Sequence, residues 1–294
     1  MIVVSDTAAL AEHLSPLRHR ADTIAFVPTM GNLHDGHLAL VNQARAAADA
    51  VVVSIFVNPM QFAADEDLYA YPRTLDDDLS ALRETGVDLV LTPSADDIYP
   101  NTSARHTAIH VPELGDALCG KDRPGHFDGV CTVVYKLFRL VGPDIAVFGE
   151  KDLQQLLIIK KMVADLSLSI DIQSVATQRA EDGLALSSRN QYLSASDRAV
   201  APLLWQTLQS CGATLTATPD SEPASIIDPA RETLKQAGFT VDYLELRELS
   251  TLQLVDELTS ACSSTTRAIR RAKGTGGGVR GYGRQPSARR QSLS

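Results

Sequence analysis

The sequence predicts an α/β fold in which a doubly wound parallel sheet is followed by a smaller α+β domain. Short apolar runs rich in β-branched residues recur over the first 177 residues, and segments with helical spacing separate them. Continuous apolar runs are typical of strands buried on both faces, and their alternation with helices indicates a parallel sheet. The chain has 294 residues, of which 44% are hydrophobic and 21% charged. This composition excludes a disordered or fibrous protein.

Five short apolar runs are the expected strands of the parallel sheet: 24–28, 50–57, 87–91, 144–148 and 170–175. Between them, apolar residues such as Leu38, Val41 and Ala44 recur with the spacing of a helix. The expected helices of this part are 38–48, 75–85 and 152–166. Because parallel neighbours need a crossover connection, each β-α-β unit is expected to be right-handed.

After about residue 177 the pattern changes. Helical spacing recurs around 199–209 and 224–237, and residues 241–246 alternate like a strand with one solvent-exposed face. The expected organisation is therefore a first domain over residues 1–177 and a second, smaller domain over residues 178–266.

The charge of the chain is unevenly distributed. The formal net charge is −9, but eight of the 27 Lys and Arg residues and none of the 36 acids lie from Arg267 onward. Residues 1–266 thus hold 19 bases against 36 acids, a net charge of −17. Residues 267–294 are rich in glycine and have few apolar side chains, so a mobile basic tail is expected there.

The ends and the cysteines point to a cytoplasmic protein. No apolar run approaches the length of about 20 residues that spans a bilayer, and the first residues lack the layout of a signal peptide. The four cysteines form no C-x-x-C pair, which favours reduced thiols over a disulfide framework or a zinc site. No membrane partner is expected.

The first chemical motif follows the expected strand 24–28 and runs from Met30 to His37. A helix that begins there offers free N–H groups and a partial positive charge, which suit phosphate. His34 and His37 are three residues apart and project from one face of that helix. The alternatives are one capping and one packed histidine, or a metal site, for which a third ligand at recognisable spacing is missing.

Two further motifs supply hydrogen-bond donors. Gly149 to Gln155 follow a strand directly, and Lys151 can bring a point charge to a phosphate. Asp152 also suits a helix N-cap, so a turn with a cap is the structural alternative. Ser187, Ser188 and Arg189 offer hydroxyl and guanidinium donors suited to phosphate or carboxylate, although such a stretch alone is also typical of a solvated loop.

Two amides, one arginine and a run of acids complete the candidates. Asn58 and Gln61 follow the second strand, where amides can recognise hydroxyl, carboxylate or amine groups, although an ordinary turn explains them as well. Arg123 precedes a long apolar segment and can hold a carboxylate. Asp76, Asp77 and Asp78 open a helix, where either Mg²⁺ binding or the helix dipole accounts for the run.

Six motifs, taken in order over about residues 20–200, resemble the pantothenate synthetase family. They begin at Pro28, Phe56, Tyr71, Arg123, Phe148 and Asp182. The resemblance implies a Rossmann-like nucleotidyl-transferase fold, a smaller C-terminal lid domain and a cytosolic homodimer. It also implies condensation of pantoate with β-alanine to pantothenate, a coenzyme A precursor, driven by ATP with Mg²⁺.

The resemblance assigns the candidate site residue by residue. It implies an ATP site formed by Met30, Gly31, Asn32, Leu33, His34, Asp35, Gly36, His37, Gly149, Glu150, Lys151, Asp152, Gln178, Leu186, Ser187, Ser188 and Arg189. It implies that Gln61 serves both pantoate and β-alanine, that Gln155 holds pantoate, and that His37 is the proton donor. With the residue-based candidates, Asn58 and Arg123 join the pantoate site, His34 and Lys151 join His37 in catalysis, and Asp77 and Asp78 are the candidate metal ligands.

Two other functions remain open at this stage. A nucleotidyl-transferase that stops after moving a nucleotide onto a phosphorylated acceptor shares the H-x-G-H turn, but not the set formed by Gln61, Arg123 and Gln155. Analysis of the product distinguishes the two. The basic tail suggests a nucleic-acid or membrane arm, but its only aromatic residue is Tyr282 and the acidic body opposes such binding, so a nucleic-acid partner is not expected.

The C-terminus departs from the family pattern. Members end with a strand and an R-L-I-D-N-like sequence, and nothing after Leu258 matches it. We therefore expect the final strand to be missing or replaced, for example through a shifted reading frame, and the second domain to be loosened while the active site remains.

Overall fold

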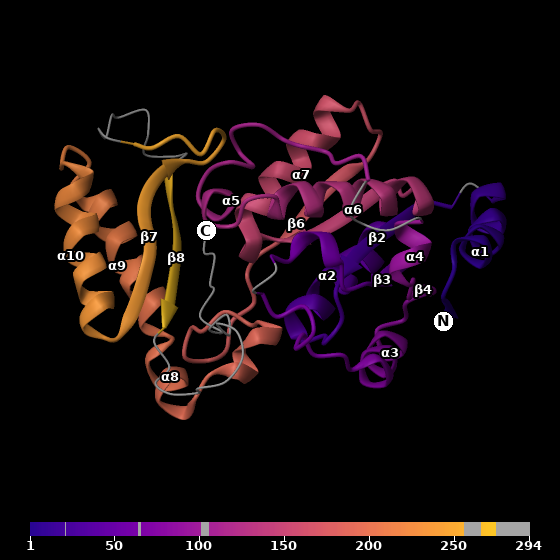
Figure 1. The fold of residues 1–294 in the computed structure, drawn as a ribbon, viewed down its shortest axis with the longest axis horizontal. Helices are drawn as coiled ribbons and strands as arrows, with labels where there is room; N and C mark the ends of the chain where they lie inside the picture. The colour runs from indigo at the N-terminus through magenta and orange to yellow at the C-terminus, as the bar shows by residue number, and fades with distance from the viewer. Residues whose placement is uncertain (21, 64–65, 101–105, 256–265, 275–294) are drawn as a thin grey trace.

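A parallel sheet of six strands forms the centre of the N-terminal part in the computed structural model (Figure 1). The structure describes residues 1–20, 22–63, 66–100, 106–255 and the strand 266–274. The strand order is β1-β4-β3-β2-β5-β6, and every neighbouring pair is parallel. The strands are β1 (Ile2–Val4), β2 (Ile24–Thr29), β3 (Ala50–Ile55), β4 (Leu89–Leu91), β5 (Ile145–Gly149) and β6 (Asp171–Val175). The predicted α/β sheet is confirmed, and β1 is a strand that the sequence analysis did not identify.

Helices cover both faces of this sheet because its strands are apolar on both sides. Along β2, Phe26 packs into the cluster formed with α1, α6 and α7, and Val27 packs into the cluster formed with α2 and α3. The helices of the first face are α1 (Thr7–His19), α6 (His126–Val141) and α7 (Leu153–Asp165). Those of the second face are α2 (Asp35–Ala47) and α3 (Leu75–Glu84). Short helical turns connect them: η1 (Pro59–Gln61), α4 (Ala95–Ile98), α5 (Cys119–Asp122), η3 (Glu150–Asp152) and η4 (Ser188–Tyr192).

The order of the strands places a topological switch point between β2 and β5. From β2 the chain moves outward through β3 to β4, and from β5 it moves outward in the other direction to β6. Ala25 of β2 pairs with Ile145 of β5. Ligands of open α/β sheets bind beyond the carboxyl ends of the strands at such a point, because the following loops diverge there. Met30 to His37 follow β2, and Glu150 to Asp152 follow β5.

The C-terminal part has its own apolar cluster. Its elements are α8 (Ala195–Val200), α9 (Leu203–Ala217), α10 (Pro223–Gln236), β7 (Phe239–Glu248) and β8 (Thr266–Gly274). Figure 1 shows α9 and α10 on one side of β7 and β8, with the N-terminal part on the other side. Leu208, Leu234 and Leu244 lie in this cluster, whereas Tyr243 of β7 packs with the main core. The Tyr243 hydroxyl lies 2.9 Å from Cys119 Sγ.

The strand β8 corrects the expectation of a mobile tail from residue 267 onward, and the last strand, expected to be missing or replaced, is not missing. Residues 266–274 pair antiparallel with β7, and Leu244 lies opposite Arg270. The sequence analysis expected no strand there because this segment has few apolar side chains. The pairing uses backbone N–H and C=O groups at the edge of β7, so it does not depend on apolar side chains. Residues 275–294, the remainder of the expected tail, lie outside the described part of the chain, and the domain boundaries stay a prediction.

Candidate active site

The turn between β2 and α2 is held by a buried carboxylate. Asp78 of α3 accepts hydrogen bonds from the N–H groups of Asn32 (2.9 Å) and Leu33 (2.7 Å). Gly31 and Asn32 adopt left-handed backbone conformations, with φ of 78° and 50°, and this turns both N–H groups of the next residues toward Asp78. The Asp78 residue is 3% exposed. Its role is therefore to shape the turn.

This finding changes the interpretation of the acidic run. Asp77 is exposed on α3, whereas both oxygens of Asp78 accept hydrogen bonds from the protein, one of them also from the Thr74 hydroxyl. In the described part of the chain, no group of three or more His, Cys, Asp or Glu residues is arranged to hold a metal ion. The geometry of Asp78 thus favours the structural alternative over a metal ligand.

His34 and His37 form a capping box at the start of α2. His34 Nδ1 accepts a hydrogen bond from the N–H of Gly36 (3.1 Å), and His37 Nδ1 accepts one from the N–H of His34 (3.3 Å). The two ring centroids lie 4.1 Å apart. Because Nδ1 of each ring is an acceptor, a neutral imidazole at either position carries its proton on Nε2. Both rings therefore offer an Nε2–H donor.

The surroundings keep these imidazoles neutral at physiological pH. Burial lowers the pKa of His34 to about 4, and the Lys151 charge contributes in the same direction. Burial also lowers the pKa of His37 to about 3, with smaller contributions from His34 and Lys151. A buried, neutral Nε2–H group is a hydrogen-bond donor rather than a source of free protons. The two histidines are thus suited to donate to anionic oxygens.

Two adjoining cavities of about 200 Å³ and 170 Å³ open at the switch point. Both are lined by Met30, His34, His37, Gln61, Tyr71, Lys151, Asp152 and Gln155. The first is also lined by Gly36, Asn58, Gly149, Gln178 and Leu186. The second is also lined by Arg123, Ser187, Ser188 and Arg189. The structure therefore brings most of the predicted site residues to one place.

Five predicted ATP-site residues line neither of these two cavities. Gly31 borders a third cavity beside Asp78, and Asn32 and Leu33 direct their N–H groups to that carboxylate. Glu150 accepts a hydrogen bond from Ser174 of β6 (3.1 Å), while Asp35 lies in the first turn of α2. These residues contribute to the shape of the site rather than to the walls of its two cavities.

Asn58 supports its neighbour Gln61. The Asn58 residue is 1% exposed, and its Nδ2 donates to the Gly129 carbonyl (3.0 Å) and to Gln61 Oε1 (3.2 Å). Its Oδ1 accepts from the Tyr99 hydroxyl (2.8 Å). A Cβ atom at Gly129 would lie 2.3 Å from the Met60 carbonyl oxygen, so this close approach of α6 to η1 requires glycine. The geometry favours a positioning role for Asn58 over direct contact with pantoate.

The two predicted anion-binding arginines are both paired with carboxylates of the protein. Arg123 donates from Nε to Glu66 (2.7 Å) and from Nη2 to the same carboxylate. Arg189 donates from Nε and Nη2 to the two oxygens of Asp67, both at 2.9 Å. Sequence reasoning missed Glu66 and Asp67, although the run of three acids at 65–67, between the Gln61 and Tyr71 motifs, was a usable signal. Each arginine therefore already has a carboxylate partner within the protein before any substrate anion binds.

Comparisons with known proteins identify the family of this chain. The family model described as pantoate-beta-alanine ligase matches residues 2–273, which includes the segment of β8 up to Lys273. A pantothenate synthetase of Chromohalobacter salexigens is 53% identical over 252 residues, covering 86% of this chain and 88% of that protein. One from Shewanella piezotolerans is 50% identical over 256 residues, covering 87% and 90%.

Solved structures give the same result. The crystal structure of pantothenate synthetase from Thermus thermophilus superposes with a TM-score of 0.86 at 40% identity, covering 100% of this chain and 99% of that chain. The Francisella tularensis pantoate-beta-alanine ligase, complexed with β-γ ATP and β-alanine, has a TM-score of 0.74 at 35% identity, covering 83% and 89%. In the described residues, no helix is long and apolar enough to cross a membrane. The chain belongs to the pantoate-beta-alanine ligase family.

Proposed function

We infer that this chain condenses pantoate with β-alanine to form pantothenate, using ATP and proceeding through a pantoyl adenylate. The observation that carries this inference is the pair of adjoining cavities, whose shared wall presents two neutral histidines, Lys151, and the amides of Gln61 and Gln155. A nucleotide and a small carboxylate bound side by side fit this arrangement. The Francisella relative, solved in complex with β-γ ATP and β-alanine, supports it.

In the first half-reaction the pantoate carboxylate attacks the α-phosphorus of ATP in line, and pyrophosphate leaves. The carboxylate is its own nucleophile, so the protein has to align the reactants and stabilise the charge that develops on the phosphate oxygens. The Nε2–H groups of His34 and His37 and the ammonium of Lys151 are the donors for this task. His37 acts here as a hydrogen-bond donor to phosphate.

In the second half-reaction the amine of β-alanine attacks the acyl carbon of the adenylate, a C–N bond forms and AMP leaves. The amine loses a proton to solvent as this bond forms. Gln61 lines both cavities, and its amide can both donate to a carboxylate and accept from an amine. Gln155 lies on the same shared wall and is assigned to pantoate. A pre-aligned amine and acyl group need no protein nucleophile.

The proposal includes Mg²⁺ bound with ATP, a homodimer and a cytoplasmic location. Asp152 is the only carboxylate among the described residues that line the two cavities, and it is paired with Lys151 at 3.1 Å. This donor set fits a Mg²⁺ ion that is held mainly by phosphate oxygens and water, as is usual for nucleotide-bound Mg²⁺. The ion would supply charge neutralisation on the phosphates.

The test is a coupled assay of AMP release by the full chain. Release that requires ATP, pantoate and β-alanine together, with pantothenate as the second product, supports the proposal. A stable nucleotidylated product that accumulates without β-alanine consumption contradicts it, and favours the nucleotidyl-transferase alternative.

Replacing Gln61 with alanine is expected to weaken pantoate and β-alanine binding while sparing ATP. The variant loses the amide that the two small substrates share, so their KM values should each rise about tenfold or more, the effect of losing one or two hydrogen bonds to charged groups. The ATP affinity, measured by calorimetry, should stay unchanged. Gln43→Ala, at an exposed position on α2, is the matched control. A fall in ATP affinity without a change for pantoate would contradict the assignment.

A further inference from the structure

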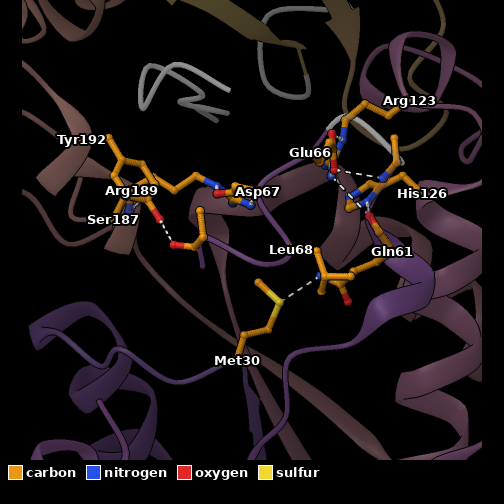
Figure 2. Close-up of polar contacts among 12 residues, drawn as sticks. Met30, Gln61, Glu66, Asp67, Leu68, Arg123, His126, Ser187, Arg189 and Tyr192 are labelled. Atoms are coloured by element: carbon orange, nitrogen blue, oxygen red, sulfur yellow. Dashed lines mark hydrogen bonds and ion pairs between the residues drawn. The ribbon is translucent and has the colours of Figure 1, made fainter. Parts of the chain in front are cut away.

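Two consecutive carboxylates, Glu66 and Asp67, each hold one of the arginines beside the second cavity. Figure 2 shows Arg123 and Arg189 on opposite sides of the view, with Glu66 and Asp67 between them. The carboxylates are buried, with side chains that are 5% and 4% exposed, although they belong to a loop between η1 and α3. Burying two charges costs free energy unless each is paired with good geometry. Both pairs meet this condition because both are bidentate.

The Asp67 pair determines which side of the Arg189 guanidinium is occupied by the protein. Asp67 occupies the side formed by Nε and Nη2, so the end formed by Nη1 and the second Nη2 proton lies outside the pair. A guanidinium has five donors in a rigid fork, and a carboxylate on one side fixes the direction of the rest. The Tyr192 hydroxyl also donates to the Ala70 carbonyl (3.0 Å). The segment carrying Arg189 is thus attached to the loop at two points.

The Glu66 pair acts on Gln61 instead. Arg123 Nη2 donates to the Gln61 carbonyl (3.3 Å), and its Nη1 lies 2.9 Å from His126 Nε2. His126 Nδ1 lies 2.8 Å from the same carbonyl oxygen, which can only accept, so the His126 proton is on Nδ1 and Nε2 accepts from Arg123. Glu66, Arg123 and His126 therefore form one network that holds the backbone of Gln61.

We propose that Glu66 and Asp67 are positioning residues with separate substrates: Asp67 aims Arg189 at the phosphates of ATP, and Glu66 fixes Gln61 for pantoate and β-alanine. This inference rests on the proposed function and assigns to that site two residues that touch no substrate. Adjacent residues in one loop thereby position the groups that bind different substrates. The phosphates approach the outer end of Arg189 without displacing Asp67.

Single isosteric substitutions in the full chain test the proposal. Asp67→Asn is expected to raise the KM for ATP about tenfold, with the KM values for pantoate and β-alanine within about twofold of the unaltered chain. Glu66→Gln is expected to raise the KM values for pantoate and β-alanine about tenfold and to leave the KM for ATP within about twofold of the unaltered chain. Glu245→Gln, which breaks a similar pair with Arg247 on β7 far from the cavities, should change none of the three values. Rates of AMP release with each substrate varied in turn provide the measurement.

A double-variant comparison separates positioning from general loosening. If Asp67 acts through Arg189, adding Asp67→Asn to Arg189→Ala should raise the KM for ATP by less than about twofold further. If either amide variant fails to fold, Asp67→Glu and Glu66→Asp keep the charge, displace the carboxylate by one methylene, and should show the same separation of substrates.

Two results would overturn the proposal. Equal changes in all three KM values would indicate only a structural role for the loop, and a lower KM for ATP in Asp67→Asn would mean that Asp67 competes with phosphate for Arg189. If the unaltered chain released no AMP in the presence of all three substrates, the proposed function would fail instead.

Discussion

Substitution of Lys151 by alanine is expected to slow pantoyl adenylate formation by about 10²- to 10³-fold, the effect of removing one donor to a transition-state charge. Lys151 lies in η3 directly after β5, and it borders both cavities. It is the only lysine among the described residues that line these cavities. In the proposed mechanism, its loss removes a positive charge that stabilises the negative charge developing on the phosphate oxygens.

The measurement is a rapid-quench experiment on the single-turnover formation of the adenylate, with β-alanine omitted. The thermal midpoint should stay near that of the unaltered chain, because Lys151 contributes no apolar packing to the core clusters. Lys161→Ala is the matched control, since Lys161 forms a surface pair with Asp165 on the exposed side of α7. An unchanged rate for Lys151→Ala would rule out this role.

The second large effect is expected for His37. Removing its imidazole by His37→Ala should reduce the same rate by about 10²-fold or more, because a buried donor to the developing phosphate charge is lost. His37→Gln retains an N–H donor of similar reach and should recover part of the rate. The exposed residue His19 provides the control, through His19→Ala.

The pH profile distinguishes a neutral donor from a general acid. With its pKa lowered to about 3 by burial, His37 remains neutral over about pH 5 to 9, so it should contribute no step to the rate in this range. An inflection near pH 6.5, the ordinary pKa of histidine, that disappears in His37→Gln would show that the imidazolium is required. That result would replace the hydrogen-bond role with proton transfer.

The parallel sheet was predictable because its signal is local. The runs 24–28 and 50–57 are continuous and apolar, and they became β2 and β3 with ends shifted by at most two residues. The positions of the turn after β2 and the turn after β5 followed from the same pattern, since the carboxyl ends of parallel strands lie at the same edge of the sheet. The residues that line the cavities were therefore found largely from motif position and family resemblance.

The partners of charged residues were not predictable in this way. Arg123 and Glu66 are 57 positions apart, and Arg189 and Asp67 are 122 positions apart. Each arginine by itself has the same donors for a substrate anion as for a protein carboxylate, so only the fold decides which one it meets. The acidic run was ambiguous for the same reason, because the Asn32 and Leu33 N–H groups reach Asp78 only after α3 has packed beside the turn.

Periodicity and short motifs were sufficient to establish the class of the sheet, the place of the turns after β2 and β5 and the family, because they are properties of neighbouring residues. Three matters depended on the folded chain. Folding fixed the protonated nitrogen of His34 and His37, paired both arginines with buried acids, and placed a strand at residues 266–274. Each of these depends on hydrogen bonds. A hydrogen bond forms only when its donor and acceptor lie within about 3 Å of each other, and the folded chain alone brings these groups that close.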